Sequence, residues 1–344
     1  MTEPQRLPSS RGRVPYRTLS LLVSAVLFAA GIRLLYRHLN SRELVTVWAN
    51  LDLRLLAAAA LVYWLQYPIN SFRLHRVIMW ATERASTDAP SLCFLFKLTC
   101  SSGFVAAVAP VGLASDAAKI AALRLFSSLS ITDATRCALF DRVVGVQWIS
   151  VIGLAMLPLQ AIYGIDPTTI LVQALLFGGL VAGVGVLLVL PALLGLMRYD
   201  LVAKLARVFA NYRVMLFPQR SAVQLVIAIL NVLSAWGTLY LLVRASGLSA
   251  NILLVGGFVP LLQLVNSLPF LYMGWGGREL AMAATLGVAG GLTVTEAIAV
   301  SIAWGAVLIV TGAVNGVFLL GEWRVSRQAP TAARGPFAGD ASSK

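Results

Sequence analysis

Residues 114–139 (ASDAAKIAALRLFSSLSITDATRCAL) align without a gap with residues 277–302 (GRELAMAATLGVAGGLTVTEAIAVSI), at a constant offset of 163 positions. The offset aligns Asp116 with Glu279, and it also aligns Asp133 with Glu296. Only 14 of the 344 residues are acidic, so these coincidences weigh more than shared Ala or Leu. Two polar, proline-preceded segments in an apolar chain indicate an internal duplication, and such pairs mark the binding sites of many transporters.

Composition sets the class of protein. Hydrophobic residues make up 59% of the chain, and the mean hydropathy is +0.83. Soluble domains carry far more charge, whereas a run of ~20 apolar residues is enough to cross a bilayer core. The sequence therefore predicts an all-α polytopic membrane protein. Six full spans are predicted, at about 18–36, 53–71, 138–160, 168–197, 221–245 and 299–321.

Two further apolar segments, 91–126 and 252–291, are interrupted by proline, glycine and charge. If both cross the membrane once, the loop 198–220 with its five basic residues faces outward, against the positive-inside tendency. If each instead enters and returns on one side, the basic stretches 73–97 and 198–220 lie in the cytoplasm with both termini. The charge distribution favours this second arrangement, which has two re-entrant broken-helix hairpins.

The offset of 163 extends the duplication to the whole membrane domain. It carries the spans of residues 18–160 onto those of residues 168–322, and each half has three crossings. An odd number of crossings inverts the second half, so the fold class is an inverted two-fold repeat. A basic cytoplasmic N-terminus (1–17) and a disordered tail (323–344) flank the single transmembrane domain. The predicted structural breaks of the hairpins are Pro110, Gly112, Pro269, Gly274, Gly276 and Gly277.

Ionisable residues inside a membrane cost ~2.5–3.5 kcal/mol each on insertion scales, which makes them candidates for a binding site. Asp133 and Glu296 precede long apolar runs and are expected to stabilise helix N-termini. The other acids and bases of the two segments form the predicted substrate-binding set, although capping and internal ion pairing would also explain them. This set is Asp116, Lys119, Asp141, Arg142, Arg278 and Glu279.

Pairing within this set follows from helical spacing. Asp141 and Arg142 are neighbours that project in different directions, so Arg142 is expected to use another acid, Asp116 or Glu279. Lys119 lies three positions after Asp116 and is close enough to pair with it. Glycine backbone at the breaks lets an anion approach the N–H groups of a helix start.

No catalytic set is evident. The chain has two histidines, no plausible Ser-His-acid combination and no phosphate-binding Walker pattern, so no enzyme activity is expected. The spacing of cysteine, histidine and acidic residues predicts no metal site, and no cofactor is expected. Nucleic-acid binding is excluded as an explanation of the net charge of +13, because no folded soluble domain remains to provide it.

Three stretches resemble one known family. Residues 109–119 (APVGLASDAAK) are similar to its P-G-x-x-G-D-x-x-R region, residues 141–145 (DRVVG) to its D-R-x-x-G motif, and residues 267–279 (SLPFLYMGWGGRE) to its S-L-P…G-x-G-x-R-E motif. The family is the membrane domain of lysylphosphatidylglycerol synthases, also called flippase-like proteins. The chain departs from the pattern at Ser115, where the family has glycine, and at Lys119, where it has arginine.

The resemblance implies lipid translocation of a phospholipid or lipid-linked headgroup across the cytoplasmic (inner) membrane. The family's soluble synthase domain has no counterpart, so aminoacyl transfer is not implied. Arg142, Arg278 and Lys119 would hold phosphate, while Asp116 and Glu279 would balance charge or hold an amine. The expected partners are membrane lipids, either an anionic phospholipid or a lipid-linked glycan. The alternatives are a small-solute secondary transporter and a non-transporting membrane partner of a lipid-modifying enzyme or glycosyltransferase.

Overall fold

The computed structural model describes the chain from Asn40 onward with gaps, together with Arg33. The described ranges are 40–82, 89–109, 113–127, 129–194, 212–267 and 276–328. The predicted first span, 18–36, lies outside these ranges except for Arg33. Also outside them are the stretch 200–211 and four of the predicted structural breaks: Pro110, Gly112, Pro269 and Gly274. All regular secondary structure in the described ranges is helical, which confirms the all-α class.

The helices differ widely in length. They are α2 (Ser41–Ala49), α3 (Leu53–Trp64), α4 (Gln66–Ala81), α5 (Leu92–Val108), α6 (Leu113–Phe126), α7 (Ile131–Ile162), α8 (Pro167–Leu194), α10 (Pro218–Ala245), α11 (Ile252–Asn266), α12 (Gly277–Met282) and α13 (Val294–Gln328), with a 3-10 turn η1 (Arg213–Leu216) and a π turn η2 (Ala283–Gly287). Within the described residues, α7, α8, α10 and α13 are long and apolar enough to cross a membrane. They coincide with four of the predicted spans.

The predicted span 53–71 belongs to a longer helical stretch. α3 and α4 continue to Ala81, and α2 joins them at a bend of 86°; counted as one bent span, these helices would be a fifth crossing. The part of the basic stretch 73–97 up to Ala81 is therefore helical and not, as expected, part of a cytoplasmic loop. Apolar residues at helical spacing continue past Arg73, and Leu74, Val77 and Ile78 are fully buried, so burial carries the helix onward. At the other terminus, α13 runs to Gln328, beyond the predicted start of the tail at residue 323.

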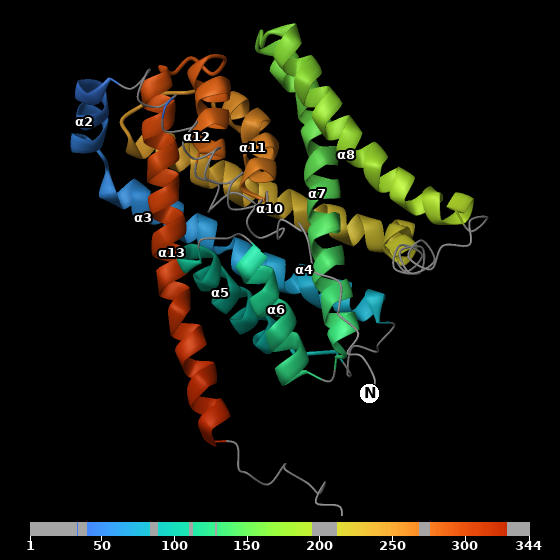
Figure 1. The fold of residues 1–344 in the computed structure, drawn as a ribbon. Helices are drawn as coiled ribbons and strands as arrows, with labels where there is room; N and C mark the ends of the chain where they lie inside the picture. The colour runs from blue at the N-terminus through green and yellow to red at the C-terminus, as the bar shows by residue number, and fades with distance from the viewer. Residues whose placement is uncertain are drawn as a thin grey trace, which may run out of the picture.

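The two interrupted segments are broken helices, as predicted. α5 ends at Val108 before α6, and α11 ends at Asn266 before α12. With 17 and 15 residues, α5 and α11 are shorter than the ~20 residues that a bilayer crossing requires. Each packs against the helix that follows its break. Figure 1 shows α5 and α6 beside the lower half of α13, and α11 and α12 near the upper ends of α7 and α13.

Helix boundaries repeat at the offset found in the sequence. α7 begins at Ile131 and α13 at Val294, which is 163 positions later. Each start carries the same cap: the backbone N–H of Asp133 donates to Ser130 Oγ, and that of Glu296 donates to Thr293 Oγ1, both at 3.1 Å. The carboxylates also take part, because Asp133 Oδ2 accepts from Ser130 Oγ at 2.7 Å and Glu296 Oε2 accepts from the backbone N–H of Thr293 at 2.8 Å, which confirms the prediction that these acids stabilise helix starts.

Each helix that precedes a break packs against a long helix from the other half of the chain. α5 packs against α13, whereas α11 packs against α7. α10 crosses α3, where Ser234 Oγ donates to the Val62 carbonyl oxygen at 2.6 Å. Figure 1 shows α3, α4 and α10 running obliquely across the steeper α7 and α13. This crosswise packing encloses the centre of the molecule, where the ionisable residues meet.

Close approach of α5 to α13 depends on a glycine. A Cβ atom on Gly312 would lie 2.5 Å from Ala107 Cβ. We expect Gly312→Ala to destabilise the protein by about 1–3 kcal/mol through overpacking. Gly179→Ala on α8 is the matched control, because a Cβ there meets nothing within 4 Å. Thermal unfolding in detergent measures both variants, and equal melting temperatures would contradict the close-packing argument.

Candidate functional site

A polar stripe on α4 forms one wall of the site. Gln66, Asn70 and Arg73 are spaced by four and three residues, so they share one helical face. A polar stripe on a membrane helix is costly against lipid and must face protein or water. All three residues line cavities at the centre of the bundle.

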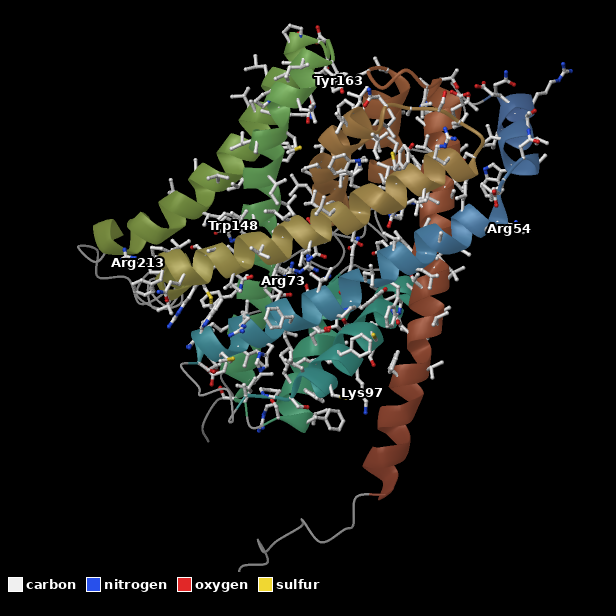
Figure 2. All side chains as sticks on the ribbon, turned by 180° about the vertical axis from the view of Figure 1, so that it is seen from behind. Arg54, Arg73, Lys97, Trp148, Tyr163 and Arg213 are labelled. Carbon is white, nitrogen blue, oxygen red and sulfur yellow. The ribbon has the colours of Figure 1, made fainter. Side chains whose placement is uncertain are left out.

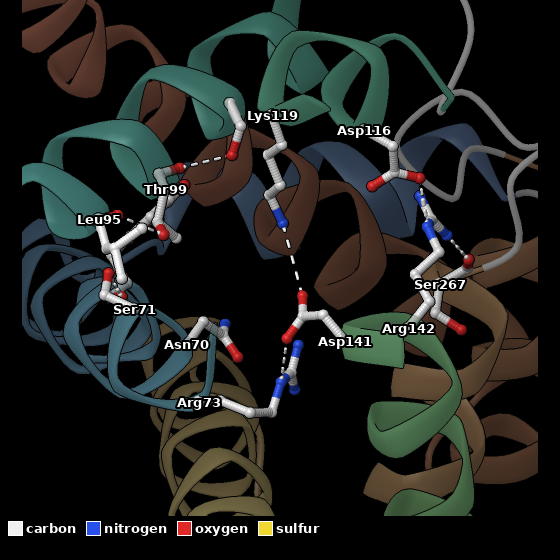
Figure 3. Close-up of polar contacts among 12 residues, drawn as sticks. Asn70, Ser71, Arg73, Leu95, Thr99, Asp116, Lys119, Asp141, Arg142 and Ser267 are labelled. Atoms are coloured by element: carbon white, nitrogen blue, oxygen red, sulfur yellow. Dashed lines mark hydrogen bonds and ion pairs between the residues drawn. The ribbon is translucent and has the colours of Figure 1, made fainter. Parts of the chain in front are cut away.

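Asp141 is the acid at the centre of the site. Arg73 Nε donates to its Oδ1 at 2.7 Å, and Lys119 Nζ lies 3.8 Å from its Oδ2. The three side chains come from α7, α4 and α6 and point toward one another (Figure 3). Asp141 is only 4% exposed, so its charge depends on these two cations. The expectation that Lys119 pairs with Asp116 is wrong, because Lys119 turns toward Asp141 instead.

Arg142 connects α7 to both broken segments. Its Nε donates to Asp116 on α6, and its Nη1 donates to the carbonyl oxygen of Ser267 at the end of α11, at 3.0 Å. Figure 3 shows both contacts beside the Asp141 cluster. This confirms that Arg142 uses an acid other than its neighbour Asp141. One guanidinium thus contacts residues of both broken segments, and Ser267 lies 125 positions after Arg142 in the sequence.

Arg278 and Glu279 form a separate, closed pair. Arg278 Nη2 donates to Glu279 Oε1 at 2.9 Å, and Ser301 on α13 contacts both side chains. The backbone N–H of Gly276, at a φ of 83° that favours glycine, donates to Glu279 Oε2 at 2.6 Å. Arg278 and Glu279 are 0% and 1% exposed, and neither is among the described residues that line the two cavities beside Asp141. The structure therefore brings together four of the six predicted site residues and sets these two apart.

Two cavities adjoin the Asp141 cluster. The first has a volume of about 270 Å³ and is lined by Lys119 and Ser115 on α6 and by polar residues of α5. The second has a volume of about 210 Å³ and is lined by residues of α7, α10, α11 and α13. They share five lining residues, so they lie on two sides of one wall. These residues are Tyr63, Gln66, Asn70, Arg73 and Asn266.

The charges beside the cavities do not cancel. Arg73, Lys119 and Arg142 supply three positive charges, and Asp116 and Asp141 supply two negative charges. An excess of one positive charge in a low-dielectric interior favours binding of one anion. A phosphodiester carries one negative charge and fits this requirement.

Sequence reasoning missed the residues of α4. Arg73 was assigned to a basic loop, and Gln66 and Asn70 were not considered. Their signal was the polar spacing i, i+4, i+7 in a stretch between two apolar runs, which a search restricted to charged residues does not detect. Asn266 was also missed, although it directly precedes the motif at residues 267–279.

Comparison with known protein families gives a match over most of the chain. Residues 18–316 match the family described as Lysylphosphatidylglycerol synthase TM region. The chain belongs to this family. A search of curated proteins found no match. The lysylphosphatidylglycerol synthase TM region match spans both broken segments and every residue of the Asp141 cluster, so the resemblance seen in three short motifs extends to the whole membrane domain.

Removing the central acid tests how the cluster is held. Asp141→Asn leaves Arg73 and Lys119 without their shared carboxylate, and we expect it to destabilise the protein by about 3 kcal/mol, as for other broken buried pairs. Asp133→Asn, at a partly exposed helix start, should cost about 1 kcal/mol or less. Thermal unfolding in detergent compares them. A loss for Asp141→Asn no larger than for Asp133→Asn would show that the acid does not hold the cluster.

Proposed function

We propose that the protein translocates a phospholipid, or another lipid with a phosphate-containing headgroup, across the cytoplasmic membrane without catalysing a reaction. The observation that carries this proposal is a cluster of five charges beside two polar cavities, inside a bundle whose long helices are apolar. Charges at such depth are costly and are retained mainly where they serve a path for a polar substrate. Membership in a family whose name refers to a lipid synthase supports lipid as the substrate class.

The proposed membrane arrangement has six crossings and two re-entrant hairpins in an inverted repeat. Three observations support it: helix starts that repeat at 163 positions, crosswise packing of α5 on α13 and α11 on α7, and the Arg142 contacts to both breaks. Backbone that leaves a helix at membrane depth must be covered by protein or water, as in the proposed hairpins.

The distribution of charged residues gives the proposed orientation of the protein in the membrane. Lys97 and Tyr163 lie toward opposite ends of the long helices (Figure 2). The connection after Tyr163 contains Asp166 and no basic residue, so this end is assigned to the outer side. The opposite end is assigned to the cytoplasm of an inner-membrane protein with both termini inside.

α4 separates two environments that suit the two parts of a lipid. Its polar face lines the cavities, while Ile69, Phe72 and Val226 of α10 line an apolar groove of about 610 Å³ on its other side. A lipid could keep an acyl chain in such a groove while its headgroup enters the polar cavities. A small solute has no use for the groove, and this favours a lipid over the solute-transporter alternative.

Lys119 is the residue proposed to receive the phosphate. Its contact with Asp141 is 3.8 Å, which is longer than the 2.7 Å contact of Arg73 with the same carboxylate. The looser cation costs less to redirect toward a ligand. Arg73 would retain Asp141 and complete the positive surface of the first cavity.

Transfer of a fluorescent phosphatidylglycerol between the leaflets of proteoliposomes tests the proposal. We expect Lys119→Gln to slow transfer about tenfold or more, because it removes a charge-assisted contact with phosphate. Arg124→Gln is the matched control, since Arg124 is an exposed base on the same helix. Equal rates for Lys119→Gln and wild type would overturn the assignment of the phosphate site.

The same preparation separates the alternatives. Wild-type protein that transfers no lipid but accumulates a soluble anion would be a solute transporter. Protein that transfers nothing alone and purifies with a lipid-modifying enzyme or glycosyltransferase would be a membrane partner of that enzyme. Either result would overturn the proposed lipid translocation.

A further inference from the structure

Two helices, α4 and α10, separate the apolar groove from the second cavity. All described residues that line the groove belong to these helices, and Val226 and Leu230 are 57% and 46% exposed, so the groove lies on the outer surface of the bundle. On each helix, residues that line the groove are chain neighbours of residues that line the cavity. The groove-lining members of these pairs are Ile69, Phe72, Ile227 and Leu230, and the cavity-lining members are Asn70, Arg73, Ala228 and Asn231. The contact between α4 and α10 is therefore the wall between lipid and the polar interior.

A bond between side chains closes this wall. Asn231 Nδ2 on α10 donates to Asn70 Oδ1 on α4 at 3.1 Å. Further along α10, Ser234 Oγ donates to the backbone carbonyl oxygen of Val62 on α3 at 2.6 Å, and a Cβ atom on Gly237 would lie 3.3 Å from Val62 Cγ1. A bond between two amide side chains can open through a change of rotamer, whereas contacts to backbone hold two helices close together. α3 is thus fixed on α10 more firmly than α4 is.

A turn at Leu65 divides α3 from α4. Three positions later, Pro68 lacks a backbone N–H group and cannot donate to the carbonyl oxygen of Trp64. Proline is a common cause of bending in helices, so α4 can swing away from α10 about this point while α3 stays in place. Such a swing does not rotate α4 about its own axis, and Arg73 still faces Asp141.

Three cations mark a route from the groove inward. Arg76 is the charged residue in the described lining of the groove, and its guanidinium carbon lies 4.9 Å from the centre of the Phe72 ring. Arg73, three positions earlier, lines both cavities, and Lys119 lines the first. α4 and α10 run side by side and descend toward the side assigned to the cytoplasm (Figure 2), so Arg76 lies on the cytoplasmic side of Arg73. A phosphate group that enters from the cytoplasmic leaflet would therefore meet these cations one after another.

We infer that the contact between α4 and α10 is a lateral gate through which lipid enters from the cytoplasmic leaflet. Asn70 and Asn231 close the gate, and Arg76 contacts the lipid phosphate at its entrance. When α4 swings away, the groove and the second cavity become one space: the headgroup passes to the polar side, and an acyl chain stays in the groove. This inference rests on the proposed function and adds the entry path and the residues that control it.

A reversible bridge across the gate tests the inference in the full-length protein. Asn70→Cys and Asn231→Cys are combined in a chain whose native cysteines (Cys93, Cys100 and Cys137) are replaced by alanine, and a one-carbon bis-methanethiosulfonate joins the two new thiols. Intact mass confirms the bridge. We expect it to slow transfer of fluorescent phosphatidylglycerol between the leaflets of proteoliposomes about tenfold or more, because α4 can no longer leave α10. Dithiothreitol should restore the rate of the unbridged protein.

A matched bridge between α3 and α10 is the control. Val62→Cys and Gly237→Cys form the control pair, because these positions approach closely in the part of α10 that does not open. The control bridge should change the transfer rate by less than about twofold. Equal rates for the two bridged proteins would overturn the lateral gate while leaving lipid translocation intact. Absence of transfer by the unmodified protein would instead overturn lipid translocation and the gate together.

The charge at the entrance has a test of its own. Arg76→Gln should slow transfer about threefold or more, and Arg76→Lys should restore most of the rate, because an ammonium group also contacts phosphate. Arg124→Gln, which removes an exposed base of α6, should keep the wild-type rate. Melting temperatures of the variants in detergent show whether a slower rate reflects loss of the fold. A wild-type rate for Arg76→Gln would overturn entry at this end of the groove.

Discussion

The contact that the rest of the structure depends on is the one made by Arg142. The Arg142 side chain is 33% exposed, and its guanidinium donates to the Asp116 carboxylate and to the carbonyl oxygen of Ser267. These groups lie next to the two helix breaks, where backbone groups lose their regular partners. One side chain of α7 therefore contacts a residue beside each break, and one of these residues, Ser267, lines the second cavity.

α4 contacts a polar environment on one face and an apolar environment on another. The face with Gln66, Asn70 and Arg73 meets the polar cavities, and the face with Ile69 and Phe72 meets the apolar groove. Hydrophobic burial and charge pairing therefore act on adjacent faces of the same helix. Rotating this helix would expose Arg73 to lipid and separate it from Asp141, so the ion pair also sets the orientation of the groove.

The sequence predicts the helices better than it predicts the ion-pair partners of their charged side chains. Repetition at 163 positions identified the broken segments and the caps at Asp133 and Glu296, because both depend on local spacing. The partner of Lys119 could not be found this way. Its ammonium group lies at the end of a long side chain that reaches α7 as easily as its own helix, and only the packing of α6 on α7 selects Asp141. Arg73 was misplaced because positive charge near a predicted span end suggested a loop.

Comparison of equivalent positions explains why the site is asymmetric. The offset of 163 places Asp141 on Trp304 and Arg142 on Gly305, so α13 offers Glu279 no cation. Glu279 instead pairs with Arg278, its own neighbour, and both become sealed. The same offset places Trp304 in the lining of the second cavity, whereas its counterpart Asp141 pairs with Lys119, which lines the first. Two positions that coincide at this offset thus carry different chemistry, an acid beside the first cavity and an aromatic ring at the second, so the two cavities are not equivalent as binding sites.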